Sequence, residues 1–291
     1  MTPEFIFSVI IPVYNREQQV VETIKSVLQQ DHQSFEVIVV NDGSTDGTLQ
    51  ALNTINDSRL RIISQENAER GAARNKGSAN SRGQFITFLD SDDEFLPGHL
   101  KAAEQFISSQ PADIKMFCTG YYKENSNGAE EIRIPNDIHN KLLCGNFLSC
   151  NGVFLPRDTA LQFQFSENRL MSGLEDWELW LRITSQVKVA GKNLMTSRMR
   201  YHKGRSVLQT EPKEIEMRFS EFVNAIKAGG LLKDSESEKT IMASCESYMA
   251  LHLALTGNYR KEALQHLKSA FRWKTEIVFS RRFYATLKHL L

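Results

Sequence analysis

The feature that most constrains the fold is a regular alternation of short apolar runs and helical patterns over the first hundred residues. The apolar runs read FSVIIPV (7–13), FEVIVVN (35–41), RLRIIS (59–64) and QFITFLD (84–90). The helical patterns between them read REQQVVETIKSVLQQ (16–30), STDGTLQALNTI (44–55) and GAARNKGSANSRG (71–83). Strand, helix and strand at these lengths predict right-handed βαβ units, and therefore an α/β fold with a mostly parallel, twisted sheet flanked by helices. Ser44 or Thr45 is the expected N-cap of the second helix.

Polar side chains cluster directly after each predicted strand. The clusters are Tyr14 to Arg16, Asn41 to Asp46, Gln65 to Arg70 and Asp90 to Glu94. Ligands bind at the carboxyl ends of the strands in an open parallel sheet, so all four clusters are expected on one rim. That rim is the predicted binding site.

The remainder of the chain changes character twice. Beyond residue 110 the patterns are a hairpin at KENSNGAEE (123–131), a strand at CNGVFLP (150–156) and a helix at LEDWELWLRITSQ (174–186). From residue 211 the sequence is helical, with a helical hairpin predicted over 248–271. We therefore predict one domain over 1–210, in two halves (1–110 and 111–210), followed by a helical C-terminal extension over 211–291.

The amino-acid composition limits which classes of partner and which compartment are expected. Lysine plus arginine and aspartate plus glutamate number 35 each, so the zero net charge gives no reason to expect nucleic acid as a partner. The four cysteines are widely spread and lack CxxC spacing, which favours a reducing cytoplasm over a zinc site or a disulfide framework. No apolar run approaches the roughly 18 residues that span a bilayer. We expect a cytoplasmic protein.

Four acids follow the fourth predicted strand in FITFLDSDDEFLP (85–97). On an extended segment residues i and i+2 face the same way, so Asp90 and Asp92 are expected to project together. Paired carboxylates repel each other unless a cation or hydrogen-bond donors compensate, and hard oxygen ligands suit Mn²⁺ or Mg²⁺. The pair favours a divalent metal that also binds phosphate. The alternative is a solvated turn before a helix, where acids complement the helix dipole.

Four motifs occur together in an order and at spacings that resemble family 2 of the glycosyltransferases, enzymes of the GT-A fold. They are VIIPVYNRE, VIVVNDGSTDGT, NAERGAARNKG and FLDSDD, and the resemblance covers about residues 7–100. It implies a metal-dependent inverting transfer of a hexosyl or N-acetylhexosaminyl group from a nucleotide-diphosphate sugar, with UDP expected. The implied acceptor is a hydroxyl group of a glycan or lipid-linked glycan, as in the synthesis of bacterial polysaccharides. Residues 1–110 would then bind the donor and 111–210 the acceptor.

The resemblance also assigns roles to single residues. The nucleotide base would be held by Pro12, Tyr14, Glu17 and Asp42. Arg74 would help to hold the nucleotide end of the donor, Asp90 would contact the ribose or the donor sugar, and Asp92 would ligate the metal on the diphosphate.

A catalytic carboxylate is expected later in the chain, where GLEDWELWLRI (173–183) resembles the family's ED motif. An inverting transferase needs a base that takes the proton of the acceptor hydroxyl while its oxygen attacks the anomeric carbon. We predict Asp176 as this base, with Glu175 as the second choice. The alternative is that both acids only stabilise the start of a helix.

The string MRYHKGRSV (199–207) resembles a family loop that closes on the donor diphosphate. His202 would then be a metal or phosphate ligand, and Arg205 would neutralise charge on the leaving group. The alternative is that the string has a structural role only.

The C-terminal residues 260–291 carry eight lysines and arginines against two glutamates, a net charge of +6, interleaved with five aromatic residues. A basic aromatic helix can lie on anionic lipid, which would place the protein at the inner face of a membrane. It can equally pack on the catalytic domain with a solvated basic face.

Two other functions stay open. FITFLDSDD also fits the motif of haloacid-dehalogenase phosphatases, with Asp90 or Asp92 as nucleophile, although that motif normally ends the first strand of the core and here three strand–helix units precede it. A non-catalytic nucleotide-sugar or glycan binding protein on the same fold is the other, because fold and site residues alone do not prove catalysis. The absence of GxGxxG after the first strand disfavours a dinucleotide-dependent oxidoreductase.

Overall fold

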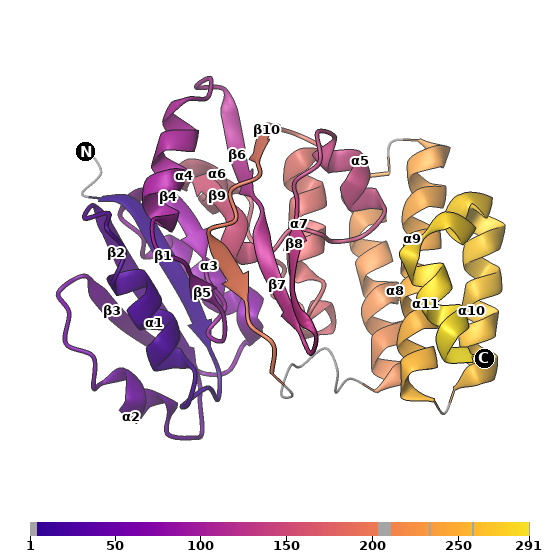
Figure 1. Cartoon of the computed structure of the whole chain (residues 1–291), viewed down its shortest axis with the longest axis horizontal. Coiled ribbons are helices and arrows are strands. Elements are labelled where there is room, and N and C mark those ends of the chain that lie inside the picture. Colours follow the sequence, from indigo (N-terminus) through magenta and orange to yellow (C-terminus); the bar gives the residue numbers. More distant parts are fainter. Residues whose placement is uncertain (1–4, 203–210, 233, 258, 291) are drawn as a thin grey trace.

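A seven-stranded sheet forms the centre of the protein, in a computed structural model that describes residues 5–202, 211–232, 234–257 and 259–290 (Figure 1). In spatial order its strands are β10 (Lys188–Lys192), β6 (Ile114–Thr119), β9 (Val153–Pro156), β4 (Gly83–Phe88), β1 (Phe5–Val13), β2 (Phe35–Asp42) and β3 (Leu60–Gln65). Neighbouring strands are parallel except at β9, which runs antiparallel to both β4 and β6. The predicted mostly parallel sheet is therefore confirmed.

Helices cover both faces of this sheet. They are α1 (Val20–Leu28), α2 (Thr48–Leu52), α3 (Glu69–Ala79), α4 (His99–Ser108), α5 (Ile138–Leu143), α6 (Arg157–Gln162) and α7 (Glu175–Thr184). Alternate residues of β1 supply two hydrophobic cores: Phe7 and Val9 pack with α1 and α4, whereas Ile10 packs in the cluster that includes α6 and α7. Burial on both faces explains why the strands read as continuous apolar runs.

Two local predictions were wrong. The second helix begins at Thr48 behind Gly47, because Ser44 and Thr45 are used elsewhere: the Ser44 hydroxyl accepts a hydrogen bond from the Asn15 amide, and the Thr45 amide donates to the Asn15 side chain. These bonds join the first two rim loops. The strand predicted at 150–156 starts only at Val153, after a short 3₁₀ turn, η1 (Cys150–Gly152).

A smaller sheet lies beside the main one. Its strands, in spatial order, are β5 (Glu94–Phe95), β11 (Ser197–Met199), β7 (Tyr121–Asn125) and β8 (Gly128–Ile132). The predicted hairpin is confirmed as β7 and β8, with Asn125 paired to Gly128 at its tip. Strand β11 brings the chain that leads to His202 next to the loop after β4.

Helices make up the C-terminal end, which lies at the opposite end of the molecule from β3 (Figure 1). They are α8 (Pro212–Ala228), α9 (Ser235–Thr256), α10 (Arg260–Trp273) and α11 (Arg281–Leu290), with the 3₁₀ turn η4 (Thr275–Phe279); an earlier turn, η2 (Arg169–Met171), precedes α7. The helical hairpin is confirmed, and α9 ends at Gly257 in a left-handed conformation (φ 74°) that glycine adopts without strain. Within the described residues, none of the helices is both long and apolar enough to cross a bilayer.

Helix α8 shares a core with α7. The rings of Trp177 and Phe222 stack with centroids 4.5 Å apart, and Phe219 and Ile226 are buried in the same cluster as the α7 side chains. The predicted boundary near residue 210 falls at 203–210, outside the described residues, and stays a prediction. The shared core indicates that α8 and the 1–202 region stabilise each other.

Candidate active site

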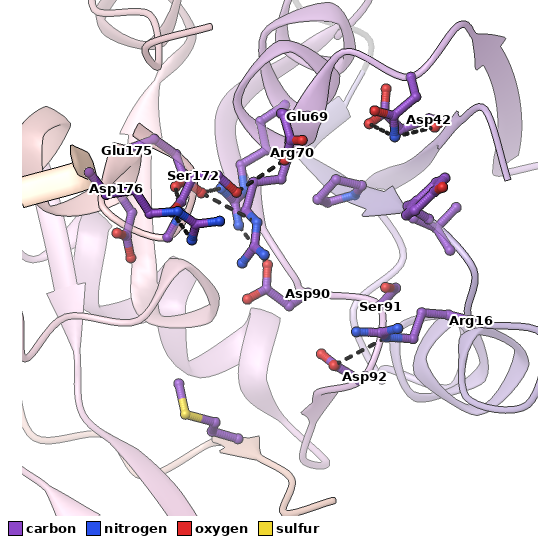
Figure 2. A pocket seen from close by; sticks show the side chains of 18 residues that line it. Arg16, Asp42, Glu69, Arg70, Asp90, Ser91, Asp92, Ser172, Glu175 and Asp176 are labelled. Carbon is purple, nitrogen blue, oxygen red and sulfur yellow. Dashed lines mark hydrogen bonds and ion pairs between the residues drawn. The ribbon is translucent and has the colours of Figure 1, made fainter. Parts of the chain in front are cut away.

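A cleft of about 610 Å³ opens at the predicted rim of the main sheet (Figure 2). Its lining combines all four rim loops with the segment that leads into the first turn of α7, one residue of β11 and one of α8. The lining residues are Pro12, Val13, Tyr14, Arg16, Asp42, Asn67, Glu69, Arg70, Arg74, Asp90, Ser91, Asp92, Ser172, Gly173, Glu175, Asp176, Met199 and Arg218. Eight of the eleven residues singled out from the sequence therefore line one cleft.

The other three lie elsewhere. Glu17 and His202 line a smaller cavity beside the cleft, together with Asp46. The Glu17 carboxylate accepts a hydrogen bond of 2.8 Å from the Gly47 amide, so it tethers the loop after β2. Arg205 lies outside the described residues.

Asp42 is fixed at one end of the cleft. Its side chain is buried and accepts hydrogen bonds from the Gln65 amide group (2.7 Å), the backbone N–H of Ala68 (2.9 Å) and the side chain of Asn67 (3.2 Å). Tyr14, which is 45% exposed, and Pro12 line the cleft too. A rigid carboxylate beside a proline and an exposed aromatic ring can hold a planar, hydrogen-bonding group such as a nucleotide base.

Arg74 ties three elements together beneath the cleft. It is buried, and its guanidinium donates to Glu175 Oε1 at 2.9 Å and to Asp90 Oδ1 at 2.7 Å. The Phe165 ring lies against it, 5.1 Å from the guanidinium carbon. A buried arginine is stable only when its charge is paired and hydrogen-bonded. Arg74 thus holds the β4 loop and the start of α7 in a fixed relation.

The four acids after β4 divide into a pair that lines the cleft, Asp90 and Asp92, and a pair that does not, Asp93 and Glu94. The Asp93 amide donates to the Asp90 carbonyl (3.0 Å), so residues 90–93 form a turn and the expected extended alternation is wrong. Asp90 faces Arg74. Asp92 faces Arg16 instead, at 3.4 Å (Figure 2). Both carboxylates still line the cleft.

Asp93 and Glu94 are structural. Asp93 is buried and accepts a hydrogen bond from the Arg200 backbone amide (3.0 Å), while Glu94 forms ion pairs with Arg198 and Arg200. These contacts attach the segment after β11 to the loop after β4. They place His202 next to Asp92, with 2.8 Å between His202 Nε2 and Asp92 Oδ2.

Asp92 and His202 are the residues best placed to hold a metal ion. Among the residues that the structure describes, no group of three or more histidine, cysteine or acidic side chains could hold one. An ion bound by Asp92 and His202 would therefore complete its shell with phosphate oxygens and water, as Mn²⁺ and Mg²⁺ commonly do.

Asp176 differs from Glu175 in its environment. Burial, reinforced by the negative charge of Glu175 and opposed by Arg74, raises the pKa of Asp176 to about 7. Its oxygens accept hydrogen bonds from the Trp177 amide (2.7 Å) and the Asn146 side chain (2.9 Å). The Glu175 carboxylate is held by Arg74 and by the Gly173 amide. Asp176 is therefore the carboxylate poised to exchange a proton near neutral pH.

Sequence reasoning missed several lining residues, and Arg218 is the most informative. This α8 residue donates to the Ser172 carbonyl at 2.6 Å and to Glu214 at 2.6 Å, so the helical extension forms part of the cleft wall. No motif surrounds Arg218, and its partner lies 46 residues away. Glu69 and Arg70 stand within the motif NAERGAARNKG, which is the signal in the sequence that points to them.

Comparison with known proteins identifies relatives. The model of the family described as glycosyl transferase family 2 matches residues 8–169. An uncharacterized glycosyltransferase of Rickettsia conorii is 34% identical over 207 residues, which are 68% of this chain and 33% of that protein. The chain thus spans about a third of the length of this relative. WfgD of Escherichia coli, named a UDP-Glc:alpha-D-GlcNAc-diphosphoundecaprenol beta-1,3-glucosyltransferase, is 32% identical over 65% of this chain and 74% of its own.

Solved structures share the fold. Staphylococcus aureus TarS 1–349 in complex with UDP superimposes with a TM-score of 0.66 and 20% identity, covering 98% of this chain and 88% of that one. The mannosyltransferase PcManGT of Pyrobaculum calidifontis, in complex with GDP-Man and Mn²⁺, gives a TM-score of 0.54 and 18% identity, covering 99% and 88%. At these identities the likeness concerns the fold.

Proposed function

The chain belongs to glycosyltransferase family 2, and from that membership we propose that it transfers a hexose or N-acetylhexosamine from a UDP-sugar to a hydroxyl group of a lipid-linked glycan, with inversion. One observation carries this proposal: a single cleft brings together the buried carboxylate of Asp42, the carboxylate of Asp92, and Asp176 with its raised pKa. They would supply the base-binding, metal-binding and proton-accepting groups that such a reaction requires.

The donor would lie along the cleft from Asp42 to Asp90. Uracil would contact Pro12, Tyr14 and Asp42, and the diphosphate would lie near Arg16 and Asp92. UDP is proposed because WfgD is named for UDP-Glc and TarS was solved with UDP. PcManGT binds GDP-Man, so the base has to be tested.

Asp92 and His202 would hold a divalent ion, because a carboxylate oxygen and an imidazole nitrogen lie side by side, and bonds to the ion would replace the hydrogen bond of 2.8 Å that joins them. A bound Mn²⁺ or Mg²⁺ would neutralise charge on the departing diphosphate. Arg16, which pairs with Asp92, lines the same part of the cleft and would contact the phosphates. The proposed contribution of Arg205 to the leaving group stays a prediction from the motif.

The reaction itself would be a single displacement at the anomeric carbon. Asp176 takes the proton of the acceptor hydroxyl, the acceptor oxygen forms a bond to the anomeric carbon, and the bond from that carbon to the phosphate oxygen breaks, so UDP leaves with the electron pair. Glu175, Arg74 and Asp90 would stay rigid during this step because the buried Arg74 pairs with both carboxylates. We propose that they position the base and the donor sugar.

The acceptor we propose is carried by a membrane lipid. The extension exposes large apolar side chains, namely Phe271 (46%), Trp273 (36%), Phe279 (80%) and Tyr284 (60%). Exposed cations beside them are Lys268, Arg272 and Lys288. Aromatic and basic side chains together favour an anionic lipid surface, so this region would bring the protein to the inner face of the membrane.

Flotation on vesicles tests this membrane contact. The doubly substituted Phe271→Ser/Phe279→Ser protein should float less than the wild type on vesicles that contain anionic lipid. Leu49→Ser is the matched control, because Leu49 is 37% exposed on α2, in the strand–helix half of the chain. Equal flotation of all three proteins would discard the membrane contact.

Thermal melting with nucleotides tests the donor site. We expect UDP with Mn²⁺ to raise the melting temperature, since a ligand at 100 times its Kd adds about 2.7 kcal/mol to the free energy of unfolding. GDP and ADP should raise the melting temperature less than UDP does. In Asp92→Ala, UDP should give little rise in melting temperature, and Mn²⁺ should no longer increase it. No shift with any nucleotide would remove the proposed donor site and favour a phosphatase or a glycan-binding protein.

A further inference from the structure

Glu69 has an unusual backbone conformation. Its φ is +72°, and in the described part of the chain only one other non-glycine residue, Asn15, has a positive φ. Asparagine tolerates the left-handed region because its short side chain can bond to nearby backbone, whereas a glutamate there is strained. Strain of this kind persists where the surrounding structure enforces it, and it gathers at functional sites.

The strained backbone directs the Glu69 carboxylate into the cleft. Glu69 is the first residue of α3, it lines the cleft, and its side chain is 32% exposed. One oxygen accepts a hydrogen bond from the Ser172 hydroxyl at 3.0 Å, and the other lies 3.5 Å from Arg169 Nη1 (Figure 2 shows the Ser172 side). A carboxylate has about four acceptor positions, so two oriented contacts leave capacity for a ligand's hydroxyl groups.

The neighbours of Glu69 show which part of the cleft it faces. Ahead of it, the Ala68 amide donates to Asp42 at 2.9 Å. Behind it, Arg70 Nε lies 3.7 Å from the Glu175 carboxylate. Glu69 therefore stands between the end proposed for the nucleotide base and the acids at the start of α7. In a nucleotide-sugar donor, the transferred sugar lies between the diphosphate and the catalytic base.

We propose that Glu69 is a specificity-determining residue that accepts hydrogen bonds from hydroxyl groups of the transferred sugar, with Ser172 orienting its carboxylate. This inference rests on the proposed function. It assigns Glu69 to sugar recognition rather than to the nucleotide, the metal or the proton transfer. Loss of the carboxylate should then weaken the binding of UDP-sugars while the binding of UDP itself is retained.

Isothermal titration calorimetry with Mn²⁺ measures this directly. The probes are UDP, UDP-glucose and UDP-N-acetylglucosamine, and the proteins are wild type, Glu69→Gly and Glu69→Gln. We expect the Kd for UDP to change less than about twofold, and the ratio of Kd for the preferred UDP-sugar to Kd for UDP to rise about tenfold or more, since a hydrogen bond to a charged group is lost. Glu66→Gln is the matched control, an exposed glutamate in the same loop that does not line the cleft.

Folding is checked independently. Glycine relieves the left-handed strain while the Ser172 bond is lost, so the melting temperature of Glu69→Gly should stay within about 2 °C of wild type. A Kd ratio that is unchanged in both Glu69 variants, or a wild type that binds UDP but neither UDP-sugar, would overturn the role of Glu69 and leave the donor site standing. A ratio unchanged together with a raised KM for the acceptor would also overturn it, because Glu69 would then act on the acceptor. Failure of the wild type to bind UDP would overturn the proposed function and this inference together.

Discussion

Replacing Asp176 by asparagine should abolish transfer and also change stability in opposite directions at low and high pH. The pKa of Asp176 is raised from its ordinary 3.8 to about 7, chiefly by burial and then by the charge of Glu175. Between about pH 4 and pH 7 the folded protein therefore holds a proton that the unfolded chain releases. The free energy of unfolding falls as pH rises through this window, and above pH 7 the ionised carboxylate destabilises the fold.

The magnitude follows from this shift. A pKa shift of about three units corresponds to a loss of at most about 4 kcal/mol in the free energy of unfolding when Asp176 ionises. Solvent screens part of this penalty because Asp176 is only partly exposed to it and only partly buried, so we halve the value to about 2 kcal/mol. Asparagine removes that penalty but loses the hydrogen bond from Asn146, worth about 1 kcal/mol. The variant should thus be more stable than wild type by about 1 kcal/mol at pH 9, and less stable by about 1 kcal/mol at pH 3, below the pKa of the unfolded chain, or roughly 2 °C in melting temperature each way.

Differential scanning calorimetry at the two pH values measures both differences. Asp158→Asn is the control, because the exposed Asp158 carboxylate also accepts a hydrogen bond from the next backbone amide, at 2.7 Å. If the difference in stability between Asp176→Asn and wild type keeps one sign at both pH values, the pKa of Asp176 is not raised in the folded protein as described. In the wild type, kcat/KM should fall about tenfold per pH unit below pH 7.

Three further predictions concern the core, the metal and the rim. Phe222→Ala should lower the free energy of unfolding by about 3–5 kcal/mol, because it leaves a cavity against Trp177. The control, Phe271→Ala at the surface, should lower it by less than about 1 kcal/mol. Unfolding in urea measures both values. His202→Ala should weaken the binding of UDP in the presence of Mn²⁺ by about tenfold, measured by calorimetry, while the melting temperature of the free protein stays unchanged. An unchanged affinity would show that His202 is not a ligand of the metal or the phosphate. Gly71→Ala should lower the melting temperature, because an added Cβ would lie 2.3 Å from the Ser166 carbonyl oxygen, and a normal melting temperature would show that this loop can move.

The main sheet was predictable because β1 and β2 are buried on both faces, and because each of the first four strands reads as a short run rich in branched apolar residues followed by a helical pattern. The rim was predictable for a related reason, since residues that follow parallel strands must meet at one edge. Turns were harder. Ser44 and Thr45 have the chemistry of an N-cap but bond to Asn15, thirty residues earlier, and the acids at 90–93 form a turn whose two cleft-lining carboxylates face different cations.

Long-range pairing limited what the sequence could say about the site. The motif around His202 can be recognised in the sequence, but the contact of His202 with Asp92 depends on the pairing of β11 with β5. Arg198 and Glu94, which form an ion pair across this strand pair, are 104 residues apart in the sequence. Arg218 enters the cleft because Phe222, one turn later on α8, packs on Trp177. No local pattern in the sequence encodes that contact. The positive φ of Glu69 likewise cannot be predicted from its residue type, because glutamate rarely adopts this conformation.

Release of UDP over many turnovers is the defining measurement for a glycosyltransferase with this cleft. The wild type would be incubated with a UDP-sugar, Mn²⁺ and a lipid-linked N-acetylglucosamine diphosphate acceptor, and compared with Asp176→Asn at equal occupancy by UDP. We expect each wild-type molecule to release many UDP molecules, dependent on the acceptor, and the variant to release none above background. Binding of UDP by both proteins without turnover by the wild type, or equal turnover by both, would contradict it.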